Sequence, residues 1–161
     1  MASPVATLSR MLDTLVDDVG ELKGQSLEIL YRQRAAAYLS RIARRIKTLS
    51  TDEVGILLDD AVDQGQLADA ERDDILLADL IVQGRRRDDG TQVCLVVEIS
   101  VDIGPHDVER AVQRATLLGK LRTPAIAVVA GKTIPEAATR LVRTQPVWQV
   151  TNGSAIPPES S

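Results

Sequence analysis

The sequence predicts an α/β domain with a mixed β-sheet, flanking helices and a long helix at its N-terminal end. One observation is the order of residues 93–130: an apolar strand, an amphipathic helix and a wholly apolar strand, as in a parallel crossover. The other is residues 77–100, where two apolar runs flank an Asp-Gly pair, as in an antiparallel hairpin. A sheet that contains parallel and antiparallel neighbours is mixed.

The length and composition agree with one domain and an appendage. The chain has 161 residues, of which 44% are hydrophobic, and it contains no Phe, so its core is expected to be aliphatic. The formal net charge is -4, which argues against a protein that coats duplex DNA electrostatically. This charge does not argue against a metal-dependent enzyme, whose site is itself built from carboxylates.

Cysteine usage and hydropathy indicate the compartment. Cys94 is the only cysteine, which excludes an intrachain disulfide and a cysteine-rich zinc site and fits a reducing environment. No apolar run reaches about 18 residues, so no membrane span is expected. Asp13, Asp17 and Asp18 interrupt the N-terminal segment, unlike a secretory signal. The protein is therefore predicted to be cytoplasmic.

Residues 1–24 are predicted to form a helical arm. Five apolar residues follow the alternating spacing of four and three that is typical of a coiled coil: Leu8, Leu12, Leu15, Val19 and Leu22. Two interpretations remain open. The arm is either an amphipathic helix that packs on its own domain, or a dimerising arm that makes the protein a homo-oligomer.

Residues 25–152 are predicted to form the α/β domain, and 153–161 a disordered tail. Its helices carry one apolar face each and are expected at 26–39, 50–64, 68–76, 105–121 and 135–143. Ser50 and Glu53 form a capping-box pattern. Its strands are short, mostly apolar runs expected at 41–49, 77–84, 93–100, 125–130 and 147–150, the last at an edge. The pattern of 41–49 also suits a helix.

Acidic and hydroxyl side chains occur inside or beside the two strands of the hairpin. Glu98 and Ser100 are two residues apart in one strand, so they share a face. A two-residue turn at Asp89-Gly90 would place Asp79 opposite Ser100, and a register shorter by two would place Asp79 opposite Glu98. Either register puts all three side chains on one face, because cross-strand partners point to the same side.

Two neighbouring carboxylates on one face predict a cation site. Asp79 and Glu98 would repel each other if both were ionised and dry, and a divalent cation removes that conflict. Carboxylate oxygens, with waters and a backbone carbonyl such as that of Ile99, suit Mg²⁺ or Mn²⁺. A metal held in this way can activate water and neutralise charge on a phosphodiester.

The order of these elements resembles the PD-(D/E)XK nuclease superfamily. The resemblance covers residues 25–150 and depends on a helix that carries Glu28, a strand with Asp79, a strand with Glu98, a helix and a further strand. More narrowly, the chain resembles a group of prokaryotic proteins in which an N-terminal coiled coil precedes such a core. The resemblance implies a restriction-endonuclease-like fold in which Asp79 and Glu98 bind the metal and Glu28 assists.

The sequence departs from the superfamily pattern at one position, where Ser100 replaces the motif lysine. A serine hydroxyl can donate a hydrogen bond but supplies no positive charge to the attacking water or the phosphate. Relatives sometimes move the basic group to the following helix, and Arg110 and Arg114 are the candidates here. We expect Arg114 to have a catalytic role beside Ser100.

The sequence is therefore compatible with two functions. The first is a metal-dependent nuclease that hydrolyses phosphodiesters of nucleic acid, with Arg85, Arg86, Arg87 and Arg110 as candidate phosphate contacts. The second is a non-catalytic interaction or oligomerisation module that keeps the fold without the lysine. The sequence contains no Gly-rich phosphate loop and no Ser-His-Asp order that would indicate another class of enzyme.

Overall fold

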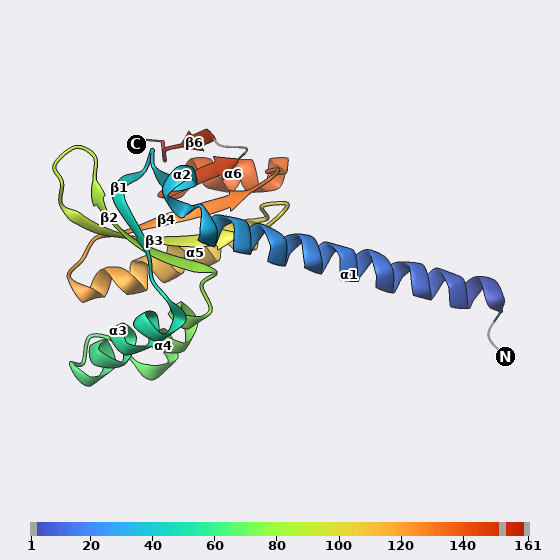
Figure 1. Ribbon diagram of the computed structural model, residues 1–161, viewed down its shortest axis with the longest axis horizontal. Coiled ribbons are helices and arrows are strands. Elements are labelled where there is room, and N and C mark those ends of the chain that lie inside the picture. The colour runs from blue at the N-terminus through green and yellow to red at the C-terminus, as the bar shows by residue number, and fades with distance from the viewer. Residues whose placement is uncertain (1–2, 152–153, 160–161) are drawn as a thin grey trace.

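The computed structural model describes residues 3–151 and 154–159 and has a mixed six-stranded sheet with flanking helices (Figure 1). The helices are α1 (Pro4–Gln33), α2 (Ala35–Leu39), α3 (Thr51–Asp63), α4 (Asp69–Leu76), α5 (Pro105–Leu118) and α6 (Glu136–Thr144), with the 3-10 turn η1 (Gly119–Leu121). The strands are β1 (Ala43–Thr48), β2 (Leu80–Arg86), β3 (Gln92–Ile99), β4 (Ala125–Gly131), β5 (Val147–Thr151) and β6 (Ser154–Ile156). The predicted α/β class is confirmed.

The strands follow one another across the sheet in sequence order. β1, β2 and β3 are antiparallel neighbours, while β3, β4 and β5 are parallel, with α5 as the predicted crossover between β3 and β4. β6 pairs antiparallel with β5, so β5 is not an edge strand and the tail is not disordered at Ser154–Ile156. A three-residue strand has too little pattern to be recognised in a sequence. The rest of the predicted tail lies partly outside the described residues.

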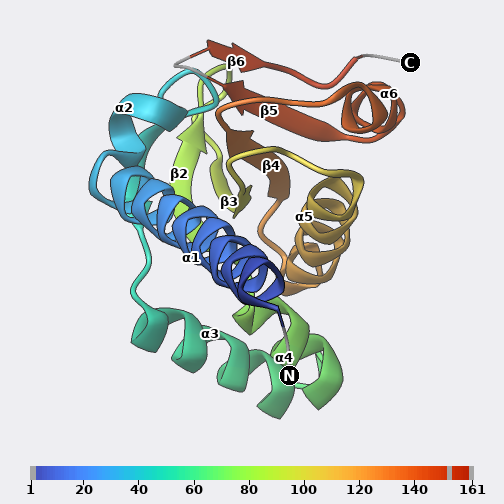
Figure 2. The ribbon, with the colours of Figure 1, turned by 90° about the vertical axis from the view of Figure 1, so that its right-hand side faces the viewer.

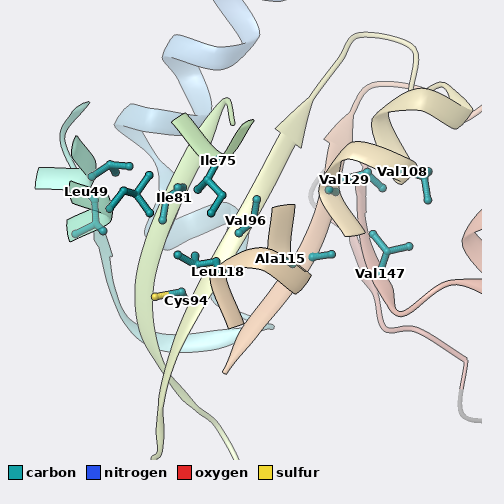
Figure 3. Close-up of a cluster of buried hydrophobic side chains, with 14 of the residues drawn as sticks. Leu49, Ile75, Ile81, Cys94, Val96, Val108, Ala115, Leu118, Val129 and Val147 are labelled. Carbon is teal, nitrogen blue, oxygen red and sulfur yellow. The ribbon is translucent and has the colours of Figure 1, made fainter. Parts of the chain in front are cut away.

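Two apolar clusters cover the two faces of the sheet. On one face, Leu27 and Tyr31 of α1 and Leu39 of α2 pack against the odd-numbered residues of β3. On the other face, α3, α4, α5 and α6 contribute to one apolar cluster with Cys94 and Val96, two even-numbered residues of β3 (Figures 2 and 3). Both faces of β3 are therefore buried, which explains its nearly continuous apolar sequence.

The helix α1 runs without a break through the expected boundary between arm and domain. Ser3 caps its N-terminus, and the helix ends at Gln33 rather than near Gly24, so the second helix does not begin at residue 26. The boundary is visible only in burial, because Leu27 and Tyr31 are the buried residues of α1. Among the described residues, neither α1 nor any other helix is long and apolar enough to cross a membrane.

The predicted start of α3 is confirmed in detail. The Glu53 amide donates to the Ser50 hydroxyl at 3.0 Å, and the Ser50 amide donates to the Glu53 carboxylate at 3.1 Å. These two bonds satisfy backbone donors that a helix start would otherwise leave without partners. The preceding segment is a strand, β1, as expected, although a bulge between Arg44 and Lys47 interrupts its register with β2.

The hairpin between β2 and β3 has the shorter of the two expected registers. Leu80 is paired with Val97, so Asp79 lies next to Glu98 and not opposite Ser100. The predicted two-residue turn is wrong, because the Arg86 amide donates to the Thr91 carbonyl at 2.8 Å across a loop of residues 87–90. Inside this loop the Asp89 carboxylate accepts from the Thr91 amide at 2.9 Å, and Gly90 has a φ of 73°.

Gly131, at the end of β4, lies directly against the segment that follows β3. A β-carbon placed on Gly131 would lie 2.0 Å from the Ser100 carbonyl oxygen and 2.9 Å from a side-chain carbon of Ile103. The neighbouring backbone holds this segment in place, since the Lys132 amide donates to the Val101 carbonyl at 3.0 Å.

Replacement of this glycine is expected to be costly. We expect Gly131→Ala to lower the free energy of unfolding by roughly 1–3 kcal/mol, because backbone atoms must move to admit the methyl group. Gly119→Ala is the matched control, because nothing lies within 4 Å of a β-carbon there. Urea unfolding of both variants tests this prediction, and equal stabilities would contradict it.

Candidate functional site

The candidate site lies at the end of the sheet where β2 begins and β3 ends. Asp79 immediately precedes β2, so it is not in mid-strand as the sequence suggested, while Glu98 is the penultimate residue of β3. The Asp79 amide donates to Glu98 Oε2 at 3.2 Å, and the Ile99 amide donates to Asp79 Oδ2 at 2.8 Å. Each carboxyl group is thus bonded to the backbone of the opposite strand, which holds the pair side by side.

Arg114, from the middle of α5, is the direct partner of Glu98. Its Nη1 lies 2.5 Å from Glu98 Oε1, and the side chains of Arg114 and Glu98 are 6% and 3% exposed. Its Nε donates to Asp74 Oδ1 of α4 at 3.1 Å, and Gln113 donates to the other oxygen of Asp74 at 3.0 Å. The Arg114 side chain therefore connects α5 with both α4 and β3, in a position that is almost inaccessible to water.

Arg110, one turn earlier on α5, is the second cation at the site. Its Nε lies 3.6 Å from Glu98 Oε1, and its Nη2 donates to Asp107 Oδ1 at 2.6 Å. Unlike Arg114, this side chain is 49% exposed. It therefore lies at the solvent side of the site, where it can reach an anionic ligand.

Glu28 of α1 approaches Asp79 from the other side of the sheet end. Burial is the main cause that raises the pKa of Glu28, followed by the negative charge of Asp79 and a hydrogen bond between the two carboxyl groups. Burial also raises the pKa of Asp79, against the opposing effects of the Ile99 amide, Glu28 and Arg114. Arg32 of the same helix donates to the Asp79 carbonyl oxygen at 3.1 Å. The structure thus brings Glu28, Asp79 and Glu98 together.

The same physical causes act on Glu98. Burial raises its pKa to about 7, with a further contribution from the charge of Asp79, while Arg114, the Asp79 amide and Arg110 act in the opposite direction. A carboxyl group with a pKa near neutrality binds a proton or another cation readily.

The Ser100 hydroxyl is bonded elsewhere than to these carboxylates, and the arginine run lies at the other end of β2. The Ser100 hydroxyl donates to the Asp102 carbonyl oxygen at 2.9 Å, so it is engaged in the segment that follows β3. Arg85 and Arg86 end β2 and Arg87 follows it, so they lie roughly 20 Å from Asp79 along the strand direction. Of the candidate phosphate contacts, only Arg110 is at the site.

Three further residues of the site were not identified from the sequence. Asp107 could have been, because its carboxylate accepts from the Gly104 amide at 2.8 Å, which is the capping arrangement at the start of α5. Asp74 and Arg32 carry no such signal. Both are polar residues on helices, and only the packing of α4 and α1 around the sheet end reveals their partners.

The residues at the site meet the chemical requirement for a hard divalent cation but do not form a complete coordination cage. Carboxylate oxygens are the protein ligands that Mg²⁺ and Mn²⁺ prefer. Within residues 3–151 and 154–159, no group of three or more acidic, His or Cys side chains is arranged to hold a metal ion. Asp79 and Glu98 supply two carboxylates, which matches Mg²⁺ sites that are completed by water and substrate phosphate.

Comparisons with known proteins identify no relative of this chain. The chain matches no model of a protein family, no curated protein and no solved structure. The function must therefore be inferred from the residues of the site themselves and from the order of the elements that carry them.

Proposed function

We propose that the chain is a nuclease-like domain that binds Mg²⁺ or Mn²⁺ through Asp79 and Glu98 and hydrolyses phosphodiesters of nucleic acid. The observation that carries the proposal is the adjacent pair of carboxyl groups at the sheet end, with Glu28 beside one and arginines beside the other. The chain order of α1, Asp79 before β2, Glu98 in β3, α5 and β4 also agrees with the PD-(D/E)XK resemblance.

The carboxylates have distinct roles in this proposal. Asp79 and Glu98 would hold the cation, which supplies activation of a water molecule and neutralisation of phosphate charge. Glu28 would support Asp79, because the two carboxyl groups share a hydrogen bond. The Asp79 and Ile99 amides hold one oxygen of each carboxylate in place, which fixes the orientation of the pair.

The arginines of α5 would replace the missing motif lysine. Arg110 is half-exposed and points its guanidinium to the same carboxylate as Arg114, so it can bind a phosphate oxygen that arrives from solvent. Arg114 is buried between Glu98 and Asp74 and therefore acts as a positioning residue. A guanidinium group supplies positive charge, which a serine hydroxyl does not.

One observation favours the second candidate function, a non-catalytic interaction module. Arg114 already neutralises Glu98 in a closed network, and the Ser100 hydroxyl is engaged with Asp102. A site of this kind can stabilise the fold without binding a metal, so that the function would reside in α1 and its partner.

Calorimetric titration of Mn²⁺ tests the metal site directly. We expect the wild-type chain to bind Mn²⁺ and the variant Asp79→Asn with Glu98→Gln to lose this binding. Because a Glu98 carboxyl with a pKa of about 7 must lose its proton first, binding should strengthen as the pH rises from 6 to 8 and should release protons. The variant Asp63→Asn with Glu109→Gln removes two exposed carboxylates and is the matched control.

Cleavage assays then separate the two candidate functions. End-labelled single-stranded and duplex DNA and RNA are incubated with Mg²⁺ or Mn²⁺ and the wild type, the double variant or Ser100→Lys. Cleavage by the wild type that is lost in the double variant and raised in Ser100→Lys supports the nuclease. Absence of both metal binding and cleavage, in the wild type and in Ser100→Lys alike, would favour the interaction module.

A further inference from the structure

The N-terminal two thirds of α1 present a continuous apolar seam to solvent. The seam consists of residues spaced alternately by three and four: Val5, Leu8, Leu12, Leu15, Val19 and Leu22. Their exposure runs from 44% for Val19 to 75% for Val5. Figure 1 shows this part of α1 extending away from the sheet. A stripe of this size on a helix of 30 residues is typical of an interface with another helix.

The domain of the same chain does not cover the seam. The only residues of α1 that are buried, within the described part of the helix, are Leu27 and Tyr31, and neither continues the seam spacing. Near the domain, a groove separates residues 12–24 of α1 from Ile99–Asp102. The seam is therefore accessible along its length, and the interpretation of α1 as a helix that packs only on its own domain does not apply to residues 5–22.

The residue types along the seam specify the number and direction of the helices that fit it. In the heptad register abcdefg, Val5, Leu12 and Val19 occupy a positions, and the d positions of the seam, Leu8, Leu15 and Leu22, are all leucine. Mostly β-branched residues at a with Leu at d favour parallel pairs over trimers or tetramers.

The flanking charges agree with the same arrangement. Asp18 occupies a g position and Lys23 the e position five residues later, and both side chains are exposed. In a parallel pair in register, Asp18 of each copy lies beside Lys23 of the other copy, which gives two ion pairs by symmetry. In an antiparallel pair, g positions face g positions, so these opposite charges would not meet.

We propose that two copies of this chain associate through α1 as a parallel, two-stranded coiled coil, with Asp18 of each copy paired to Lys23 of the other. The partner is a second copy because the a and d residues of the seam suit an identical helix, and because Asp18 and Lys23 carry opposite charges. The two domains then lie at the same end of the coil. This association does not depend on metal binding or on nuclease activity.

Charge exchange in the full chain tests the pairing. Sedimentation equilibrium is expected to give a dimer for the wild type and a dissociation constant about tenfold higher for Asp18→Lys or Lys23→Asp, since each replaces two attractions by two repulsions. The double variant Asp18→Lys with Lys23→Asp should restore the wild-type value. A wild type that is monomeric at about 100 micromolar would overturn the proposal. So would a double variant whose dissociation constant is no lower than those of the single variants.

Thiol cross-linking tests the direction. Leu8→Cys lies on the seam near the start of α1 and should form an intermolecular disulfide in a redox buffer, because in a parallel pair the same position of both copies meets. Arg10→Cys, two residues later on the outer face, is the matched control, and the wild type controls for the buried Cys94. Equal cross-linking of Leu8→Cys and Arg10→Cys, or none in Leu8→Cys, would exclude the parallel arrangement.

Discussion

Arg114→Ala is expected to lower the free energy of unfolding at pH 7 to 8 by about 3–5 kcal/mol. The substitution leaves the buried carboxylate of Glu98 without its guanidinium and removes one of two partners of Asp74. Breaking a buried ion pair costs this much because the remaining charge keeps its desolvation penalty without compensation. Equilibrium urea unfolding, monitored by circular dichroism, measures the change.

The size of this effect is best judged against two further variants. Arg140→Ala removes an ion pair with Glu136 whose side chains are 79% and 83% exposed, so we expect a change of about 0.5 kcal/mol or less. Arg114→Met combined with Glu98→Gln removes both charges and should recover part of the loss of Arg114→Ala. If Arg114→Ala lowers the free energy of unfolding no more than Arg140→Ala does, the prediction that the buried Arg114–Glu98 ion pair stabilises the fold is wrong.

Stability is also expected to fall as the pH rises through the range in which Glu98 titrates. Its pKa is about 7 in the folded chain and near 4.5 when the group is solvated. Between these values the folded state binds a proton that the unfolded state has released, so each rise in pH favours unfolding. The total contribution of this group is about 3 kcal/mol, present in full below pH 4.5 and lost as the pH rises through 7.

The variant Glu98→Gln isolates this contribution. Thermal unfolding of the wild type and Glu98→Gln between pH 5 and pH 8 should show a steeper decline for the wild type. Asp79 and Glu28, whose pKa values are raised as well, act in the same direction and keep part of the slope in the variant. Glu109→Gln removes a carboxyl group from the exposed face of α5 and is the matched control. Identical slopes for Glu98→Gln and the wild type would refute the prediction.

Local sequence patterns were sufficient to predict most of the fold. The Ser50 capping box, the apolar strands and the order of the crossover each depend on residues that are close in the chain. Boundaries were less certain where propensity and packing compete. The arm was expected to end at residue 24 and a second helix to begin at residue 26, yet α1 continues through Gly24. One glycine costs a helix only about 1 kcal/mol, and the packing of Leu27 and Tyr31 outweighs that cost.

The candidate site was predictable only in part. The alternation of side chains in strands was enough to place Asp79 and Glu98 together, whichever register the hairpin adopted. The ion pair of Glu98 with Arg114 and the contacts of Arg114 with Asp74 depend on how α4 and α5 pack on the sheet. Residue spacing does not determine those distances. The same limit applied to Ser100, whose hydroxyl donates to the carbonyl oxygen of Asp102, two residues away.

The unbroken course of α1 links the orientation of the seam to the orientation of the site. Glu28 follows Leu15 by 13 residues on one straight helix, which places it about 140° around the helix axis from the seam at about 100° per residue. In a pair formed through the seam, the two-fold axis would run along one side of α1 and Glu28 of each copy would point to the opposite side. The two Glu28 side chains would therefore not meet, and each would stay beside the Asp79 of its own copy.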